Sequence, residues 1–132
     1  MLSWIFGEVK ENLVHIHEHD RAAGYLEFDR AKVRWFLSIN ADTLPDTAKK
    51  EGKTTYRSMR LEGEEIEFSE GFKDLHNKSY AAILAGNGFR ISEALNAIKI
   101  VHEIRNTEPI GLVGDFHPFA KKPLTLHPFH LK

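Results

Sequence analysis

Apolar and polar positions alternate most clearly between Ala22 and Asn40, a stretch that reads AAGYLEFDRAKVRWFLSIN. Tyr25 to Phe28 alternates, and Asp29-Arg30 is short and polar enough to be a hairpin connection. In the second half, one set of alternate positions is wholly apolar, and the other mixes charged, polar and aromatic side chains. The stretch therefore predicts an antiparallel hairpin in a sheet covered on one face. The apolar set is Val33, Trp35, Leu37 and Ile39, and the mixed set is Lys32, Arg34, Phe36, Ser38 and Asn40.

The segment from Glu8 to Glu18 predicts a further strand, with Val14 and Ile16 on one face. On a regular strand the histidines at every second position lie together on the other face, where imidazoles bind transition metals. Three such positions span about 13 Å, which is too far for all three side chains to reach one ion. A polar sheet face is therefore favoured over a zinc or iron site, and we assign no metal ligand. The histidines are His15, His17 and His19, and Leu13 shares their face.

A second hairpin is predicted from Thr54 to Leu61 and from Glu64 to Phe68, around a Glu62-Gly63 turn. It follows a long polar loop, in which we expect one helical turn after Pro45. The side chains expected to point inward are Met59, Leu61, Ile66 and Phe68.

After residue 68 the period of the pattern changes to that of a helix. Ser69 is predicted to cap a helix from about Gly71 to Leu84, and Ser92 to cap a second helix that runs to about Asn106. Met1 to Phe6, which stops at Gly7, is typical of the last turn of a helix, so we expect the chain to start inside a longer element. The expected core-facing positions are Phe72, Leu75, Ser79, Tyr80 and Ile83 in the first helix, and Ile91, Ala94, Leu95, Ile98, Val101 and His102 in the second.

Strands followed by paired helices predict an α+β fold. We expect a mostly antiparallel, open-faced sheet of about five or six strands, with two or three helices packed on one face. A length of 132 residues suits one domain with a single core. We place this domain at residues 1–111 and a C-terminal tail at residues 112–132. The tail has no period and is apolar and aromatic, so we expect it to pack on the domain or on a neighbouring subunit.

Composition excludes several classes of function. Lys and Arg number 18 and Asp and Glu 19, a net charge of −1 with both signs interspersed, which is unlike the basic stripe of a nucleic-acid-binding protein. The chain has no cysteine, which removes disulfides and thiolate chemistry and suits a reducing compartment. No apolar run approaches the roughly 20 residues of a membrane span, and no signal peptide is recognisable. We therefore expect a cytoplasmic protein with no nucleic-acid or membrane partner.

Several segments together resemble the C-terminal domain of the Gfo/Idh/MocA oxidoreductase family, which includes glucose-fructose oxidoreductase and inositol dehydrogenase. Within that family they are most similar to the UDP-N-acetylglucosaminuronate 3-dehydrogenases of O-antigen sugar synthesis, a branch of lipopolysaccharide biosynthesis. The resemblance covers Met1 to about Gly111. The segments are MLSWIFG, AAGYLEFDRAKVRWFLSI, TTYRSMRLEGEEIEFSEGFKDLHNKSY, ILAGNGF and AIKIVHEIR.

The resemblance implies the role of a partial enzyme. The family's NAD loop and the lysine of its E-K-P motif belong to a Rossmann domain that this sequence lacks, and the Asp and His of its D-x-x-x-H motif would fall just before Met1. We therefore assign no catalytic or cofactor residue, and we expect the chain alone to be inactive because hydride transfer needs a cofactor held against the substrate. The family's bare sheet face makes subunit contacts, which implies a homo-oligomer through the face of Arg34, Phe36 and Ser38.

What remains is part of a pocket for a nucleotide sugar. Arg57, between Tyr56 and Ser58, is placed to face a pyrophosphate or carboxylate, and His76 to add a hydrogen bond. The predicted substrate-binding residues are thus Tyr56, Arg57 and His76, in an NAD-dependent oxidoreductase that oxidises a UDP-N-acetylhexosaminuronate. An ordinary strand with a surface arginine remains the alternative for residues 56–58. The alternative function is a stand-alone homo-oligomeric binding or scaffold module without catalytic activity.

Overall fold

The computed structural model describes residues 1–70 and 74–125, which fold as two compact units. The first unit combines Met1–Thr43 with Ile91–Lys132, and the second is Leu44–Arg90. Each unit contains helices and one small antiparallel sheet, so the predicted α+β class is confirmed. The described strands form sheets of three and two, however, and the single sheet of five or six strands is not found.

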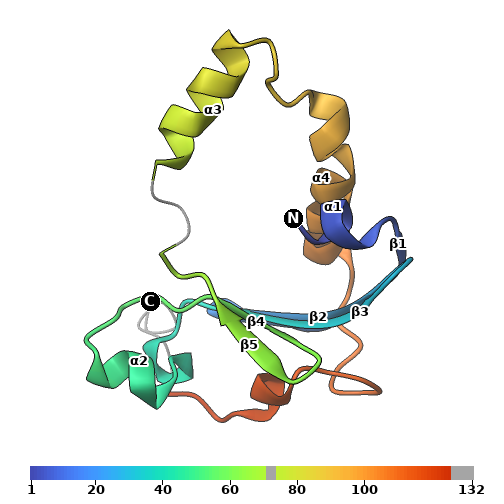
Figure 1. The fold of residues 1–132 in the computed structure, drawn as a ribbon. Coiled ribbons are helices and arrows are strands. Elements are labelled where there is room, and N and C mark those ends of the chain that lie inside the picture. The colour runs from blue at the N-terminus through green and yellow to red at the C-terminus, as the bar shows by residue number, and fades with distance from the viewer. Residues whose placement is uncertain (71–73, 126–132) are drawn as a thin grey trace. The chain divides into compact units, whose positions relative to one another are not determined.

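The first unit is built on the predicted hairpin. Strands β1 (Val9–His17), β2 (Arg21–Phe28) and β3 (Lys32–Ser38) pair antiparallel in that order (Figure 1). The Phe28 N–H donates to the Ala31 carbonyl oxygen at 2.8 Å, which closes the turn at the expected place. The local alternation was therefore sufficient to locate β2, β3 and their connection.

A β-bulge in β1 changes which of its side chains share a face. Val14 lies opposite Gly24, whereas Ile16 lies opposite Ala23, the next residue of β2. Because neighbouring residues of a strand point to opposite faces, Val14 and Ile16 do not share the face that the alternation predicted. The extra residue in the bulge is His15.

Val14 and Leu26 are buried on the apolar face that the sequence predicted to be covered, and a second cluster of buried residues lies on the face that the sequence had assigned as bare. Ile16 and Ala23 form it with Ala120, and Phe36 and Phe116 pack against them. The short 3-10 helix η2 (Pro118–Lys121) lies on the opposite side of this sheet from α4 (Ile91–Asn106) (Figure 1). The C-terminal segment is apolar enough to cover the mixed face, whereas the far end of the apolar face is open. There Leu37 is 66% exposed and Ile39 63%.

Helix α4 contacts β1 with a different stripe from the predicted one. Its end at Asn106 agrees with expectation, and its first residue, Ile91, precedes the predicted cap Ser92. The predicted positions Ile91, Ala94, Leu95, Ile98, Val101 and His102 are exposed, and the partly buried residues are Ala97, Ile100 and Ile104. The Asn12 side-chain amide donates to the Glu103 carboxylate at 3.1 Å and ties β1 to this helix.

The short helices occur where they were expected. Helix α1 (Leu2–Phe6) ends at Gly7, whose φ of 93° favours glycine. After β3 come the 3-10 helix η1 (Ala41–Thr43) and, in the second unit, α2 (Asp46–Lys50), which follows Pro45.

The second unit contains the predicted second hairpin with shorter strands. β4 (Ser58–Leu61) pairs with β5 (Glu64–Glu67) around Glu62-Gly63. Leu61 and Ile66 are about half exposed in the described chain, so they are not the inward residues that the sequence predicted. Met59 and Phe68 are partly buried. A lone two-stranded sheet has no second layer of its own, which explains why the alternation misplaces them.

Helix α3 (Leu75–Leu84) begins later than predicted. Its N-cap is Asp74, in a left-handed conformation with φ 59°, and not Ser69. The Ser69 hydroxyl instead accepts a hydrogen bond from the Arg57 N–H at 2.9 Å, so it is held at the end of the hairpin. The expected stripe residues Leu75, Ser79, Tyr80 and Ile83 are exposed, and Phe72 and the predicted start at Gly71 lie outside the described residues.

Candidate functional site

Arg57 is held at the open end of the second hairpin by Ser69. Besides the bond from its N–H to the Ser69 hydroxyl, its carbonyl oxygen accepts from the Phe68 N–H at 2.9 Å, which continues the β4–β5 pairing. Its guanidinium Nη1 donates to the Ser69 carbonyl oxygen at 3.2 Å. Arg57 is exposed, so these contacts orient a guanidinium at the surface, and a guanidinium is the group that suits planar oxygen pairs.

Tyr56 contacts the neighbouring strand through its hydroxyl. The Tyr56 O–H donates to the Glu65 carboxylate at 2.8 Å. This bond, with partial burial of the ring, raises the pKa of Tyr56 above its ordinary value. Hydrogen bonds from Ser58 and then from Tyr56 lower the pKa of Glu65. Tyr56 therefore remains a neutral donor at neutral pH, beside an ionised carboxylate.

Lys53 belongs to the same neighbourhood, although sequence analysis did not single it out. It lines an open depression together with Glu67, Phe68, Ser69 and Glu70. Its Nζ lies 2.8 Å from the Glu51 carboxylate and 3.3 Å from Glu67, and hydrogen bonds to these two groups raise its pKa. Ser69 both lines this depression and holds Arg57. In the sequence, the signal that could have pointed to Lys53 is its position four residues before Arg57.

His76 lies on the first turn of α3 and is exposed. Within residues 1–70 and 74–125, no hydrogen bond or ion pair joins it to Tyr56 or Arg57. The structure thus brings Tyr56 and Arg57 to one end of a hairpin, and it leaves the predicted contribution of His76 as a prediction.

The three histidines of the first unit do not converge. His15 in the bulge is buried, and its ring meets the Phe116 ring edge-on at 6.0 Å between centroids. His17 lies opposite Ala22 on the other face of the sheet, and His17 and His19 are exposed. In the part of the chain that the structure describes, no group of three or more His, Asp or Glu side chains could hold a metal ion.

The mixed face of the first sheet is covered by the chain's own C-terminal segment. The Phe36 ring stacks on the His117 ring at 5.6 Å and meets the Phe119 ring edge-on at 5.7 Å. At the rim, the Arg34 guanidinium lies 3.3 Å from the Asp115 carboxylate. We refer to residues 115–125 as the tail segment. It occupies the face that the sequence assigned to contacts between subunits.

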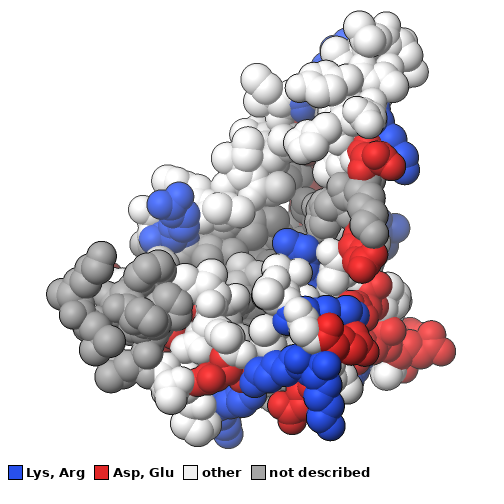
Figure 2. Space-filling model, turned by 90° about the vertical axis from the view of Figure 1, so that its left-hand side faces the viewer, with Lys and Arg blue, Asp and Glu red and all other residues white. Residues whose placement is uncertain are grey.

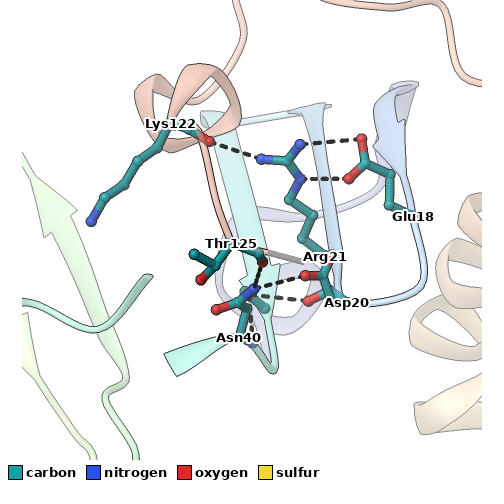
Figure 3. Close-up of polar contacts among 7 residues, drawn as sticks. Glu18, Asp20, Arg21, Asn40, Lys122 and Thr125 are labelled. Carbon is teal, nitrogen blue, oxygen red and sulfur yellow. Dashed lines mark hydrogen bonds and ion pairs between the residues drawn. The ribbon is translucent and has the colours of Figure 1, made fainter. Parts of the chain in front are cut away.

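Hydrogen bonds to its backbone hold the tail segment along the sheet (Figure 3). The Arg21 guanidinium binds the Glu18 carboxylate through two nitrogens, at 2.7 and 3.2 Å, and donates to the Lys122 carbonyl oxygen at 3.0 Å. The Asn40 side-chain amide donates to Asp20 at 2.9 Å and to the Thr125 carbonyl oxygen at 3.0 Å. Asn40 is 7% exposed and Asp20 6%, so this anchor is protected from water.

On the face drawn in Figure 2, lysine and arginine side chains lie among aspartate and glutamate. Among the described residues, no helix is long and apolar enough to cross a membrane.

These features define an α+β chain whose described residues form two antiparallel sheets, with an oriented arginine and tyrosine at the end of one hairpin. No family model matches the chain. The solved structures do include a similar protein, the WlbA (WbpB) dehydrogenase of Thermus thermophilus. Its structure in complex with NAD and α-ketoglutarate shares 44% sequence identity with this chain, at a TM-score of 0.84. The match covers 89% of this chain and 38% of that one.

A second structure of the same dehydrogenase, in complex with NAD and UDP-GlcNAcA, gives 43% identity and a TM-score of 0.83. Its coverage is again 89% of this chain and 38% of that one. The chain is therefore similar in sequence and fold to part of a dehydrogenase that binds NAD and a nucleotide sugar, and it spans about 38% of that protein's length.

Proposed function

We propose that the chain is the substrate-binding and oligomerisation part of an NAD-dependent nucleotide-sugar oxidoreductase of the Gfo/Idh/MocA family. The reaction proposed for the whole enzyme is oxidation of a UDP-N-acetylhexosaminuronate in lipopolysaccharide synthesis. The observation that carries the proposal is the 44% identity to the WlbA (WbpB) dehydrogenase over 89% of this chain. That protein has been solved with NAD and UDP-GlcNAcA.

The described residues do not form the parallel-sheet fold of a Rossmann-type dinucleotide site. Within residues 1–70 and 74–125 both sheets are antiparallel, whereas the family that binds dinucleotides at a glycine-rich turn uses parallel strands joined by helices. We therefore assign no step of hydride transfer to this chain. The catalytic and cofactor residues of the proposed enzyme lie outside it.

The proposed contribution of this chain is recognition of the nucleotide sugar. Arg57, oriented by Ser69, binds a pyrophosphate or carboxylate, since guanidinium groups pair with such oxygens through two parallel hydrogen bonds. Lys53 lines the depression beside Ser69, and its ammonium is paired there with the Glu51 and Glu67 carboxylates. Tyr56 borders the same end of the hairpin, and His76 supplies a further hydrogen bond.

The organisation of the proposed enzyme part follows from the same resemblance. We propose that residues 1–111 correspond to the family's C-terminal domain and that residues 112–132 form a tail outside it. Homo-oligomer contacts are assigned to the mixed face of the first sheet. We place the protein in the cytoplasm. This is a reducing compartment in which disulfides are rare, and the chain has no cysteine with which to form one.

A titration with UDP-GlcNAcA tests the binding role. We expect amide NMR shifts at residues 53–58 and 69, and we expect Arg57→Ala to weaken the affinity roughly tenfold or more, because a hydrogen bond to a charged group contributes about 1.5–3 kcal/mol. The matched control is Arg60→Ala, which removes an exposed arginine of the same hairpin that lies 3.8 Å from Glu65. Equal affinities for the two variants would contradict the role of Arg57. If no shift occurs at millimolar ligand, the proposed binding role is wrong.

A further inference from the structure

The connection between α3 and α4 contains the only Asn-Gly pair of the sequence, Asn87-Gly88. The Asn87 N–H donates to the Ala82 carbonyl oxygen at 2.8 Å, which satisfies one of the last carbonyls of α3. Asn87 is exposed and lies outside both helices. Its backbone is therefore tied to the end of α3, while its side chain is in contact with water.

Packing explains why the residue after Asn87 is a glycine. A Cβ built on Gly88 would lie 2.9 Å from Cγ1 of Ile83 and 3.3 Å from the Ile83 Cα. Gly86, on the other side of Asn87, has a φ of 78°, which lets the chain turn out of the helix. The fold thus places a residue without a side chain directly after an exposed asparagine, so no side chain at position 88 shields the backbone nitrogen from Asn87.

The two groups of this pair that could react with each other are unpartnered. Within the part of the chain that the structure describes, neither the Asn87 side-chain amide nor the Gly88 N–H forms a hydrogen bond. Other asparagines differ in this respect. Asn40 is buried, and its amide is used in two hydrogen bonds. Asn96 lies inside α4 and is followed by Ala97, whose backbone belongs to the helix.

We propose that Asn87-Gly88 is a site of spontaneous deamidation. The Gly88 nitrogen attacks Cγ of Asn87, so that a new N–Cγ bond forms, the Cγ–Nδ2 bond breaks, and the side-chain nitrogen leaves as ammonia with the proton of the Gly88 N–H. Water then opens the cyclic succinimide at either carbonyl, which produces aspartate or isoaspartate. Asparagine is among the chemically labile residues, and glycine offers the least resistance to closing the ring. Water is the only co-reactant.

The modification changes the end of α3. It adds one negative charge to a chain whose net charge is −1, and it places that charge beside the C-terminal end of a helix, where the helix dipole disfavours anions. The isoaspartate form also adds a carbon atom to the main chain next to the bond between Asn87 and Ala82. Deamidation therefore loosens the last turn of α3. The inference goes beyond the proposed function, since it involves neither NAD nor a nucleotide sugar.

Peptide mapping by mass spectrometry after incubation at pH 8 tests the proposal. Trypsin cleaves after lysine and arginine, so residues 79–90 are released with Asn87 as their only asparagine, and residues 91–99 with Asn96 as theirs. We expect the first peptide to gain about 1 Da over days, at a rate at least roughly tenfold that of the second. A digest at time zero corrects for deamidation during handling, and isoaspartyl methyltransferase labelling identifies the isoaspartate product.

A variant and a free peptide complete the test. Asn87→Gln keeps a side-chain amide but needs a larger ring, so we expect the mass gain of residues 79–90 to disappear. A synthetic peptide of residues 79–90 should react at a rate within about threefold of that of the folded protein, because the site needs no local unfolding. Equal rates for residues 79–90 and 91–99 would overturn the proposal. A folded rate far below that of the free peptide would also overturn it, since the connection would then protect Asn87.

Discussion

At the scale of single residues, Gly24 occupies a position in the centre of the first sheet where a side chain does not fit. A Cβ built on Gly24 would collide with the Leu13 carbonyl oxygen and would lie 2.5 Å from a ring carbon of Trp35. The bulge brings the Leu13 backbone close on one side, and the indole packs across Gly24 on the other. Unlike the end of a flexible side chain, the Leu13 backbone cannot move aside to make room for the added methyl group.

We expect Gly24→Ala to lower the free energy of unfolding by about 3 kcal/mol, at the upper end of the usual cost of overpacking. Urea denaturation followed by circular dichroism measures it. Gly52→Ala is the control, because Gly52 has φ 69° but nothing within 4 Å of its added Cβ, and it should cost about 1–2 kcal/mol for backbone strain alone. A Gly24→Ala cost no larger than that of the control would mean that the bulge and Trp35 relax around the methyl group.

Asn40 provides a second residue-scale prediction. Its amide is the donor to both Asp20 and the Thr125 carbonyl oxygen. Asn40→Asp replaces that donor with a second carboxylate beside a buried one, and two carboxylates in contact resist being ionised together. We expect a loss of about 2 kcal/mol or more at pH 7 that shrinks toward pH 4, because protonation restores a donor. Denaturation at both pH values measures it, with exposed Asn96→Asp as the control, and a loss independent of pH would contradict the explanation.

At the scale of elements, the attachment of the tail segment depends on the neutral form of His117. Its Nδ1 accepts a hydrogen bond from the Phe119 N–H at 3.2 Å, and its ring stacks on Phe36. Burial, and then the positive charge of Arg34, lower the pKa of His117 below its ordinary value of 6.5. A histidine with a lowered pKa in the folded state stabilises that state above pH 6.5, and the stabilisation is lost as the pH falls through the lowered value.

We therefore expect the tail segment to detach more readily under acidic conditions. Hydrogen exchange at the Phe119 and Ala120 amides, corrected for the intrinsic pH dependence of exchange, should show less protection at pH 5 than at pH 7.5. The control is His117→Asn, because asparagine keeps a side-chain acceptor for the Phe119 N–H and does not titrate. Its protection should be flat over this range. A wild-type profile that is equally flat would exclude His117 as the titrating group.

Helix α4 presents a second question at the element scale, namely which stripe supports the fold of this chain. Ile98 belongs to the predicted stripe and is exposed, whereas Ile100 is partly buried on the helix that contacts β1. We expect Ile98→Lys to change the free energy of unfolding by less than about 0.5 kcal/mol and Ile100→Lys to cost about 2 kcal/mol, measured by urea denaturation. The reverse order would show that the sequence stripe, and not the one observed, faces the core.

At the scale of the whole molecule, the chain is similar to only a part of a dehydrogenase. Its described sheets are antiparallel, and it spans about 38% of the similar dehydrogenase. Many large apolar side chains of α3 and α4 are exposed, among them Leu84 and Ile91. Large apolar side chains exposed along a helix are typical of contact with further protein.

We expect the chain alone to form no NADH from NAD and UDP-GlcNAcA, because hydride transfer needs nicotinamide held against the sugar and the proposed function assigns no cofactor residue to this chain. Absorbance at the NADH wavelength measures this, with the full-length Thermus thermophilus WlbA (WbpB) dehydrogenase as the positive control. Turnover by the chain alone would contradict the assignment of catalytic residues to positions outside it.

Features that depend on neighbouring residues were predictable from the sequence. The hairpin over residues 21–38, the Glu62-Gly63 turn and the glycine that ends α1 each follow from local alternation or turn chemistry. The pairing of Tyr56 with Glu65 and the orientation of Arg57 by Ser69 were not predictable. They depend on the register of two strands and on a serine that the sequence assigned to a helix cap.

The sequence by itself determined the strands, the turns, the α+β class and the absence of cysteine chemistry, because each depends on composition or on residues a few positions apart. Only the tertiary structure decided which faces are buried. One extra residue at His15 reverses the faces along β1, and a tail segment about 80 residues away from Phe36 covers the side that alternation alone left open. Burial is set by what packs on a face, and a periodic pattern shows that a face exists without showing which distant segment will cover it.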